Sequence, residues 1–94
     1  MNIVKRLLWR LRIAQVVAGQ LRSGHPVETR AAYQRLRASR FSAYGSFAMI
    51  HAVFEAELAS MLTAGRRYDH TAYLRGLDEL PAEPSISLRD VRRR

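Results

Sequence analysis

Ninety-four residues are enough for one domain, although a chain of this length buries only about 60 to 65% of its unfolded surface. The absence of cysteine excludes disulfides and thiolate metal sites, so packing must provide the stability. The apolar fraction of 48% is ordinary for a globular protein, whereas a formal net charge of +8 is not.

The charge is concentrated in the first part of the chain. Residues 1–40 hold nine basic side chains against one acid, a net +8; residues 41–80 hold three against five, a net −2; and residues 81–94 hold four against two, a net +2. Pairing between these parts therefore leaves a basic surface. Fifteen of the sixteen cations are arginine, which suits paired hydrogen bonds to carboxylate or phosphate, although a high genomic GC content would produce the same bias.

Residues 3–22 predict a helix with apolar residues on two faces. One seam follows alternating steps of three and four residues and is expected to pack on the central helix: Val4, Leu7, Leu11, Ala14, Ala18 and Leu21. A second seam contains Trp9, Ile13, Val16 and Val17, with arginines between the two. Because one seam is enough to attach a helix to a small bundle, we expect the second to form a protein interface, comprising Trp9, Ile13, Val16, Arg6 and Arg10.

The same helix has an alternative interpretation at a membrane. Its cations interrupt every apolar window, which excludes a bilayer span and a secretory signal. An acid-free, Arg-rich helix with Trp9 near its middle does resemble an organellar presequence or an interfacial membrane helix. Packing explains the regular seam better, because basic interfacial helices usually show a single apolar face.

A turn at residues 23–26 separates this helix from a second one, predicted over residues 27–41. Pro26 suits its start, and the carboxylate of Glu28 suits its positive end. Few of its residues are apolar, so we expect it to be the least buried of the main helices. Its arginines, together with the pair that follows the central helix, are candidates for nucleic-acid contacts: Arg30, Arg35, Arg37, Arg40, Arg66 and Arg67.

Residues 46–64 predict the central helix, with Ser46 as its N-cap and Gly65 as its C-cap. A fourth helix is predicted over residues 70–80, with Asp69 as its N-cap. Gly76 weakens that helix by about 1 kcal/mol relative to alanine, so it must depend on docking. Residues 81–94 are predicted to be a mobile basic tail.

The sequence therefore predicts an all-α fold: a small bundle of three to four helices in a single domain over residues 1–80, with a flexible C-terminal tail. Its core should contain Leu7, Leu11, Ile50, Val53, Phe54, Leu58, Met61, Tyr73 and Leu77.

Residues 51–81, and above all GRRYDHTAYLRGLDELP from Gly65, resemble the C-terminal part of an uncharacterised family of small helical bacterial proteins, a domain of unknown function. That family places a pair of histidines on the preceding helix. This chain has only His51 there, with Tyr44 and Phe47 in the neighbouring region. The resemblance implies helices and no particular activity.

Catalytic chemistry has no support in the sequence. His51 and Glu55 share a helix face at a spacing that provides half a metal site at best, and a surface pair is the simpler interpretation. Glu55 and Glu57, two residues apart on one helix, cannot face each other across a substrate, so they are a poor general acid and base pair. Phosphate-loop and nucleophile-elbow motifs do not occur. We therefore expect no enzyme, metal, cofactor or small-molecule substrate.

These features predict a small, basic, cytoplasmic, non-catalytic protein-binding or adaptor module whose partner is another protein or a second copy of the chain. Nucleic-acid binding through the arginines is one alternative, although helix-turn-helix spacing and zinc-finger or RNA-recognition signatures are missing. Attachment to a membrane surface through the first helix is the other alternative.

Overall fold

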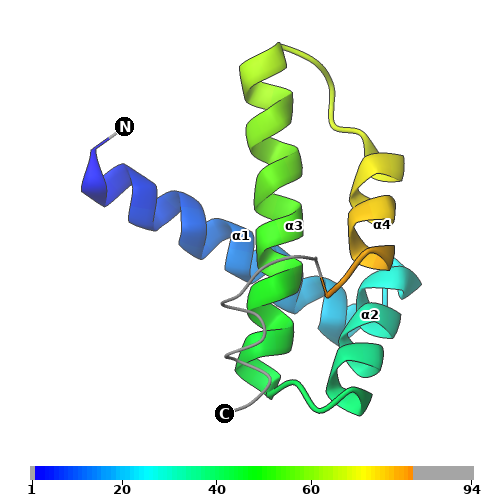
Figure 1. The fold of residues 1–94 in the computed structure, drawn as a ribbon. Helices are drawn as coiled ribbons and strands as arrows, with labels where there is room; N and C mark the ends of the chain where they lie inside the picture. The colour runs from blue at the N-terminus through cyan, green and yellow to red at the C-terminus, as the bar shows by residue number, and fades with distance from the viewer. Residues whose placement is uncertain (1, 82–94) are drawn as a thin grey trace.

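Four α-helices make up most of residues 2–81, the part of the chain that a computed structural model describes (Figure 1). They are α1 (Ile3–Ser23), α2 (Val27–Ala38), α3 (Ala43–Ala64) and α4 (His70–Asp78). No strand occurs within residues 2–81. The predicted all-α fold is therefore confirmed, whereas the predicted basic tail lies, apart from Pro81, outside the described residues.

Polar caps and left-handed glycines define several helix ends. The Asn2 side chain accepts a hydrogen bond from the Lys5 amide at 2.8 Å, and Asp69 accepts one from the Ala72 amide at 3.1 Å. Gly24 and Gly65 follow α1 and α3 with φ angles of 75° and 63°, a conformation that only glycine adopts without steric cost. The predicted caps at Asp69 and Gly65 are confirmed.

The start of α3 lies one turn earlier than predicted. Ser42 is the N-cap, and its hydroxyl accepts a hydrogen bond from the Gly45 amide at 2.9 Å. Ser46 is instead a fully buried residue inside the helix. The two serines offer the same capping chemistry, and Gly45 between them is a buried residue in the first turn of α3.

The end of α2 lies three residues before the predicted one. Arg40 adopts a left-handed conformation with φ of 76°, and the Phe41 amide donates to the Leu36 carbonyl at 3.1 Å. The Arg40 amide donates to the Arg37 carbonyl at 3.0 Å, which completes a Schellman motif. The motif turns Phe41 back into the core, where it is 3% exposed. Glycine usually marks this position, and an arginine there gives no sequence signal.

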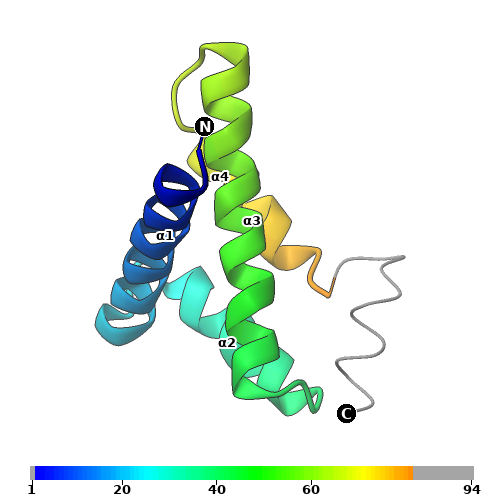
Figure 2. The same cartoon turned by 90° about the vertical axis from the view of Figure 1, so that its left-hand side faces the viewer.

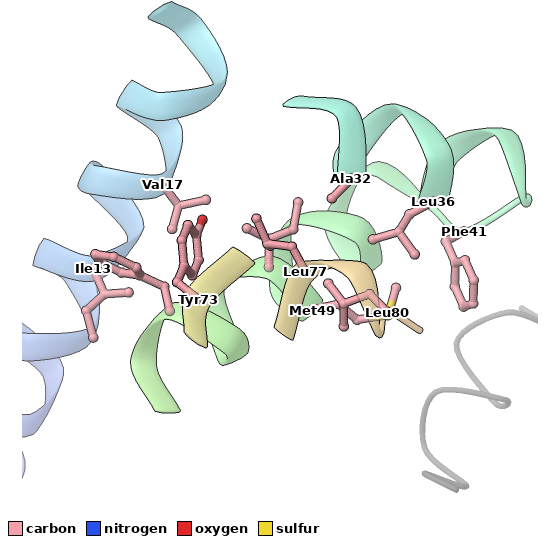
Figure 3. Close-up of a cluster of buried hydrophobic side chains, with 11 residues drawn as sticks. Ile13, Val17, Ala32, Leu36, Phe41, Met49, Tyr73, Leu77 and Leu80 are labelled. Carbon is pink, nitrogen blue, oxygen red and sulfur yellow. The ribbon is translucent and has the colours of Figure 1, made fainter. Parts of the chain in front are cut away.

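α3 is the central helix, as predicted, and α1, α2 and α4 all pack on it (Figures 1 and 2). Figure 3 shows the buried side chains of the core, which come from the four helices and, at Phe41 and Leu80, from the residues that follow α2 and α4. Ile50, Phe54, Tyr73 and Leu77 are buried as predicted. Three other predicted core residues, Val53, Leu58 and Met61, are partly buried. The assignment of Leu7 and Leu11 to the core is wrong, because they are 61% and 55% exposed.

The two seams of α1 have exchanged roles relative to the prediction. Ile13 and Val17 are buried, and Trp9 packs against the core. The C-terminal half of α1 is the part that contacts the other helices, and there the regular seam offers Ala14, Ala18 and Leu21, of which Leu21 packs against the core. Burying an isoleucine and a valine there removes more apolar surface from water than burying two alanines.

A buried polar cluster joins α1, α2 and α4. The hydroxyls of Thr29 and Tyr73 both donate to the Gln20 side-chain oxygen at 2.8 Å, and the two hydroxyls lie 3.0 Å apart. Burial raises the pKa of the Tyr73 hydroxyl, so it stays protonated and able to donate. This cluster therefore attaches α4 to two helices that are distant from it in sequence.

Candidate docking surface

The N-terminal half of α1 projects beyond the other helices (Figure 1). Every residue from Asn2 to Arg12 is exposed except Trp9, which is partly buried. Five large apolar side chains of this segment are between 54% and 71% exposed; we call them the outward face: Ile3, Val4, Leu7, Leu8 and Leu11. The helix therefore presents apolar surface where no other part of the described chain covers it.

Cations border the outward face on both sides. With 3.6 residues per turn, the five apolar side chains cover an arc of roughly 140° of the helix circumference. Arg6 and Arg10 follow one edge of that arc, and Lys5 and Arg12 follow the other. The first acidic residue in the chain is Glu28, in α2. The segment is thus an apolar strip between two rows of positive charge.

A groove of about 320 Å³ continues this surface between α1 and α3. Its lining includes Leu11 of the outward face and Tyr44 of α3, which is 83% exposed. His51 lies across it, with its Nε2 atom 3.1 Å from the Arg10 carbonyl oxygen and its Nδ1 atom 3.8 Å from Glu55 Oε1. The predicted pairing of His51 with Glu55 is confirmed, and His51 also links α3 to α1.

The residues predicted to form a protein interface lie partly in the core and partly on different sides of α1. Ile13 is 2% exposed and belongs to the core, so its assignment to a surface is corrected. Trp9 is partly buried against the core, and Val16 is 45% exposed on another side. Arg6 and Arg10 lie at the border of the outward face. Contact with a partner at any of these residues stays a prediction.

Six arginines were predicted to contact nucleic acid, and two of them instead donate hydrogen bonds to the ends of helices within the protein. Arg30 donates to the Leu21 carbonyl from Nε at 3.1 Å and from Nη2 at 2.7 Å. Arg35 Nη2 donates to the Leu77 and Leu80 carbonyls at 2.8 and 3.0 Å. The last carbonyls of a helix lack intrahelical partners and carry partial negative charge. The two guanidinium groups therefore stabilise the C-terminal ends of α1 and α4.

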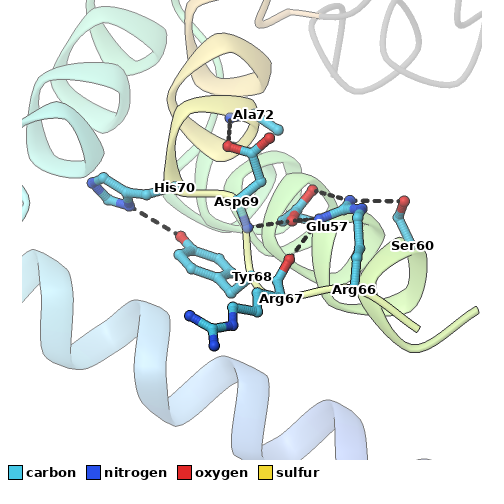
Figure 4. Close-up of polar contacts among 8 residues, drawn as sticks. All are labelled: Glu57, Ser60, Arg66, Arg67, Tyr68, Asp69, His70 and Ala72. Carbon is cyan, nitrogen blue, oxygen red and sulfur yellow. Dashed lines mark hydrogen bonds and ion pairs between the residues drawn. The ribbon is translucent and has the colours of Figure 1, made fainter. Parts of the chain in front are cut away.

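A third arginine, Arg66, holds the connection between α3 and α4 (Figure 4). Its Nη1 and Nη2 atoms donate to the two carboxylate oxygens of Glu57 at 2.8 and 3.0 Å. The Asp69 amide donates to the same carboxylate at 2.9 Å. Hydrogen bonds from Arg66 and the Asp69 amide lower the pKa of Glu57 below its ordinary value, although burial opposes them. Glu57 is thus a structural residue that sequence reasoning missed.

The other three arginines predicted to contact nucleic acid differ in their surroundings. Arg37 Nη1 donates to the Phe41 carbonyl at 3.0 Å, within the Schellman turn. Arg40 and Arg67 are exposed. Four of the six arginines thus form hydrogen bonds within the protein, and nucleic-acid contact by any of the six stays a prediction.

The described residues also bear on metal binding and on membrane-spanning helices. Among residues 2–81, no three His, Asp or Glu side chains lie close enough together to hold a metal ion. α3 is long and apolar enough to cross a membrane, with 22 residues and a mean hydropathy of 1.3 in its most apolar window. The central helix of a globular bundle meets the same criteria.

Comparison with protein-family models, curated proteins and solved structures finds no match to this chain. The resemblance of residues 51–81 to a bacterial family of unknown function therefore stays a prediction.

Proposed function

We propose that this chain is a non-catalytic docking protein that attaches to a larger partner through the outward face of α1. The observation that carries the proposal is the exposure of five large apolar side chains on a segment that projects from the bundle. Soluble proteins seldom leave a contiguous apolar patch uncovered unless it binds something. The proposal keeps the predicted adaptor role and moves its surface from the Trp9 seam to the opposite side of the helix.

The outward face provides enough driving force for such a role. Full burial of one leucine or isoleucine side chain is worth about 1.5 to 3 kcal/mol. Five side chains that are each a little more than half exposed therefore provide a gain comparable to the roughly 8 kcal/mol of a micromolar complex, before the costs of association. The bordering cations add a requirement: the partner must offer an apolar surface with anionic groups beside it.

Photo-crosslinking in cells tests the docking role without naming the partner. Benzoylphenylalanine, which inserts into nearby C–H bonds of protein or lipid, would replace Leu7 in one variant and Gln34, an exposed residue of α2, in a control variant. We expect adducts from position 7 and few from position 34. Equal yields at the two positions would contradict a docking role for the outward face.

A further inference from the structure

We infer that the outward face docks on the surface of an anionic lipid bilayer, an inference that rests on the docking function proposed above. An interfacial helix lies in the plane of the bilayer, with its apolar face in the acyl boundary and its cations extended toward the phosphates. That geometry requires positive charge along both edges of a single apolar arc. Arg6 and Arg10 on one edge, with Lys5 and Arg12 on the other, meet this requirement.

The fold removes the main objection to a membrane role for α1. A helix that is apolar on two sides fits an interface poorly, because its second apolar side would face water. In the folded protein that second side is covered: Ile13 and Val17 are buried, and Trp9 packs against the core. Of that seam only Val16, at 45%, remains exposed, so one continuous apolar arc is left exposed on the projecting half of α1. The remaining helices can then stay in water while α1 lies on the bilayer.

Tyr44 adds an aromatic side chain beside the outward face. It lines the α1–α3 groove together with Leu11 and is 83% exposed. Tyrosine is enriched at membrane–water interfaces, where its ring meets the acyl boundary and its hydroxyl stays hydrated. The groove thus carries an interfacial residue at the border of the outward face.

A second copy of the chain fits this surface less well. Pairing two outward faces would bring four cations of one chain beside four of the other, and no acidic residue precedes Glu28 to offset them. Nor is the Glu57 carboxylate of a second copy free, because Arg66 and the Asp69 amide occupy it. An anionic bilayer instead offers negative charge on both sides of the helix in every orientation.

The experiment uses the full chain and two kinds of vesicle, one of phosphatidylcholine alone and one that also contains phosphatidylglycerol. Flotation at low and moderate salt measures the bound fraction. We expect binding to the anionic vesicles to be at least about tenfold tighter than to the neutral ones and to weaken as salt is added. Equal binding to both kinds of vesicle would overturn the inference.

Matched variants locate the surface. Leu7→Ser with Leu11→Ser should weaken vesicle binding at least about tenfold, because two side chains leave the acyl boundary. Val27→Ser with Leu62→Ser removes two equally exposed apolar side chains elsewhere and should change binding little. Circular dichroism checks that each variant stays helical. Similar losses in both pairs would show non-specific adsorption and overturn the assignment to the outward face.

A second pair of variants separates position from total charge. Lys5→Gln with Arg12→Gln lowers the net charge by two at one edge of the outward face. Arg67→Gln with Arg75→Gln lowers it by the same amount elsewhere. We expect at least about a threefold larger loss of binding in the first pair, because electrostatic attraction falls off within a Debye length of the bilayer. Equal losses would contradict docking through this edge.

The remaining outcomes separate this inference from the docking function. If the chain binds neither kind of vesicle but position 7 forms protein adducts in cells, the partner is a protein and only the membrane inference fails. If neither vesicles nor adducts are found, both fail. Bound chain that resists extraction by alkaline carbonate would indicate insertion of α3 and would also overturn peripheral docking through α1.

Discussion

Phe54 and Leu7 show how differently the fold treats two large apolar residues. Phe54 is 8% exposed, and its ring centroid lies 5.2 Å from that of Tyr73, whereas Leu7 is 61% exposed. Phe54→Ala should lower the free energy of unfolding by about 3 to 5 kcal/mol through lost burial and a cavity, and Leu7→Ala by less than about 0.5 kcal/mol. Urea denaturation measures both. A loss below about 1 kcal/mol for Phe54→Ala would contradict the core described above.

Glu57 predicts a specific dependence of stability on pH. A carboxyl group whose pKa is lowered in the folded state adds stability above its unfolded pKa, near the ordinary value of 4.5, and that contribution is lost as the pH falls through the folded pKa. The difference in unfolding free energy between wild type and Glu57→Gln should therefore be constant near neutrality and shrink below about pH 4.5. Urea titrations at a series of pH values measure it. A difference that does not change with pH would show that the ionised form of Glu57 adds no stability over a neutral side chain.

At the scale of helices, Gly76 allows a close contact between α4 and Val53 of α3. A Cβ atom added there would lie 2.6 Å from Val53 Cγ1, too close for any real contact. Gly76→Ala should thus destabilise the protein by about 1 to 3 kcal/mol, although alanine is the better helix former by about 1 kcal/mol. Combining it with Val53→Ala should cost less than the sum of the two single changes, because the second change removes the clash.

Gly19, inside α1, is the matched control for this prediction. The nearest atom to an added Cβ there is Arg22 Nη2 at 3.8 Å, an ordinary contact. Gly19→Ala should therefore stabilise the protein by about 0.5 to 1 kcal/mol, measured by the same denaturation. Destabilisation of similar size at both glycines would refute the assignment of a tight contact to Gly76 alone.

The sequence predicted a helix end correctly where only one residue nearby could act as the cap. Asp69 and Gly65 are the natural caps of their helices, and the structure uses them as such. Prediction failed where two residues offered the same chemistry, as Ser42 and Ser46 do, and where Arg40 took a conformation that usually requires glycine. These failures arise from tertiary packing, which selects among local options of similar energy.

For the molecule as a whole, the sequence indicated a basic protein but not where its charges would be used. Arg35 contacts the carbonyl of a residue 42 positions away, and no local pattern predicts such a contact. The assignment of Ile13 to a surface was wrong for a related reason. The sequence pattern identified both apolar seams of α1. Only the folded structure shows that the N-terminal half of the helix extends beyond the other helices, which leaves the larger side chains of the regular seam exposed.

The hydrogen bonds of Tyr73 have a consequence for the order of folding. Its hydroxyl contacts Thr29 and Gln20, which are 44 and 53 residues away, so the complete cluster forms only when α1, α2 and α4 have all come together. Closing such long loops costs entropy before the contacts form, which places the docking of α4 late on the folding route. Tyr73→Phe should therefore speed unfolding in stopped-flow experiments by most of its effect on stability, about 0.5 to 1.5 kcal/mol, and leave refolding nearly unchanged. A slower refolding limb would instead place α4 in the nucleus.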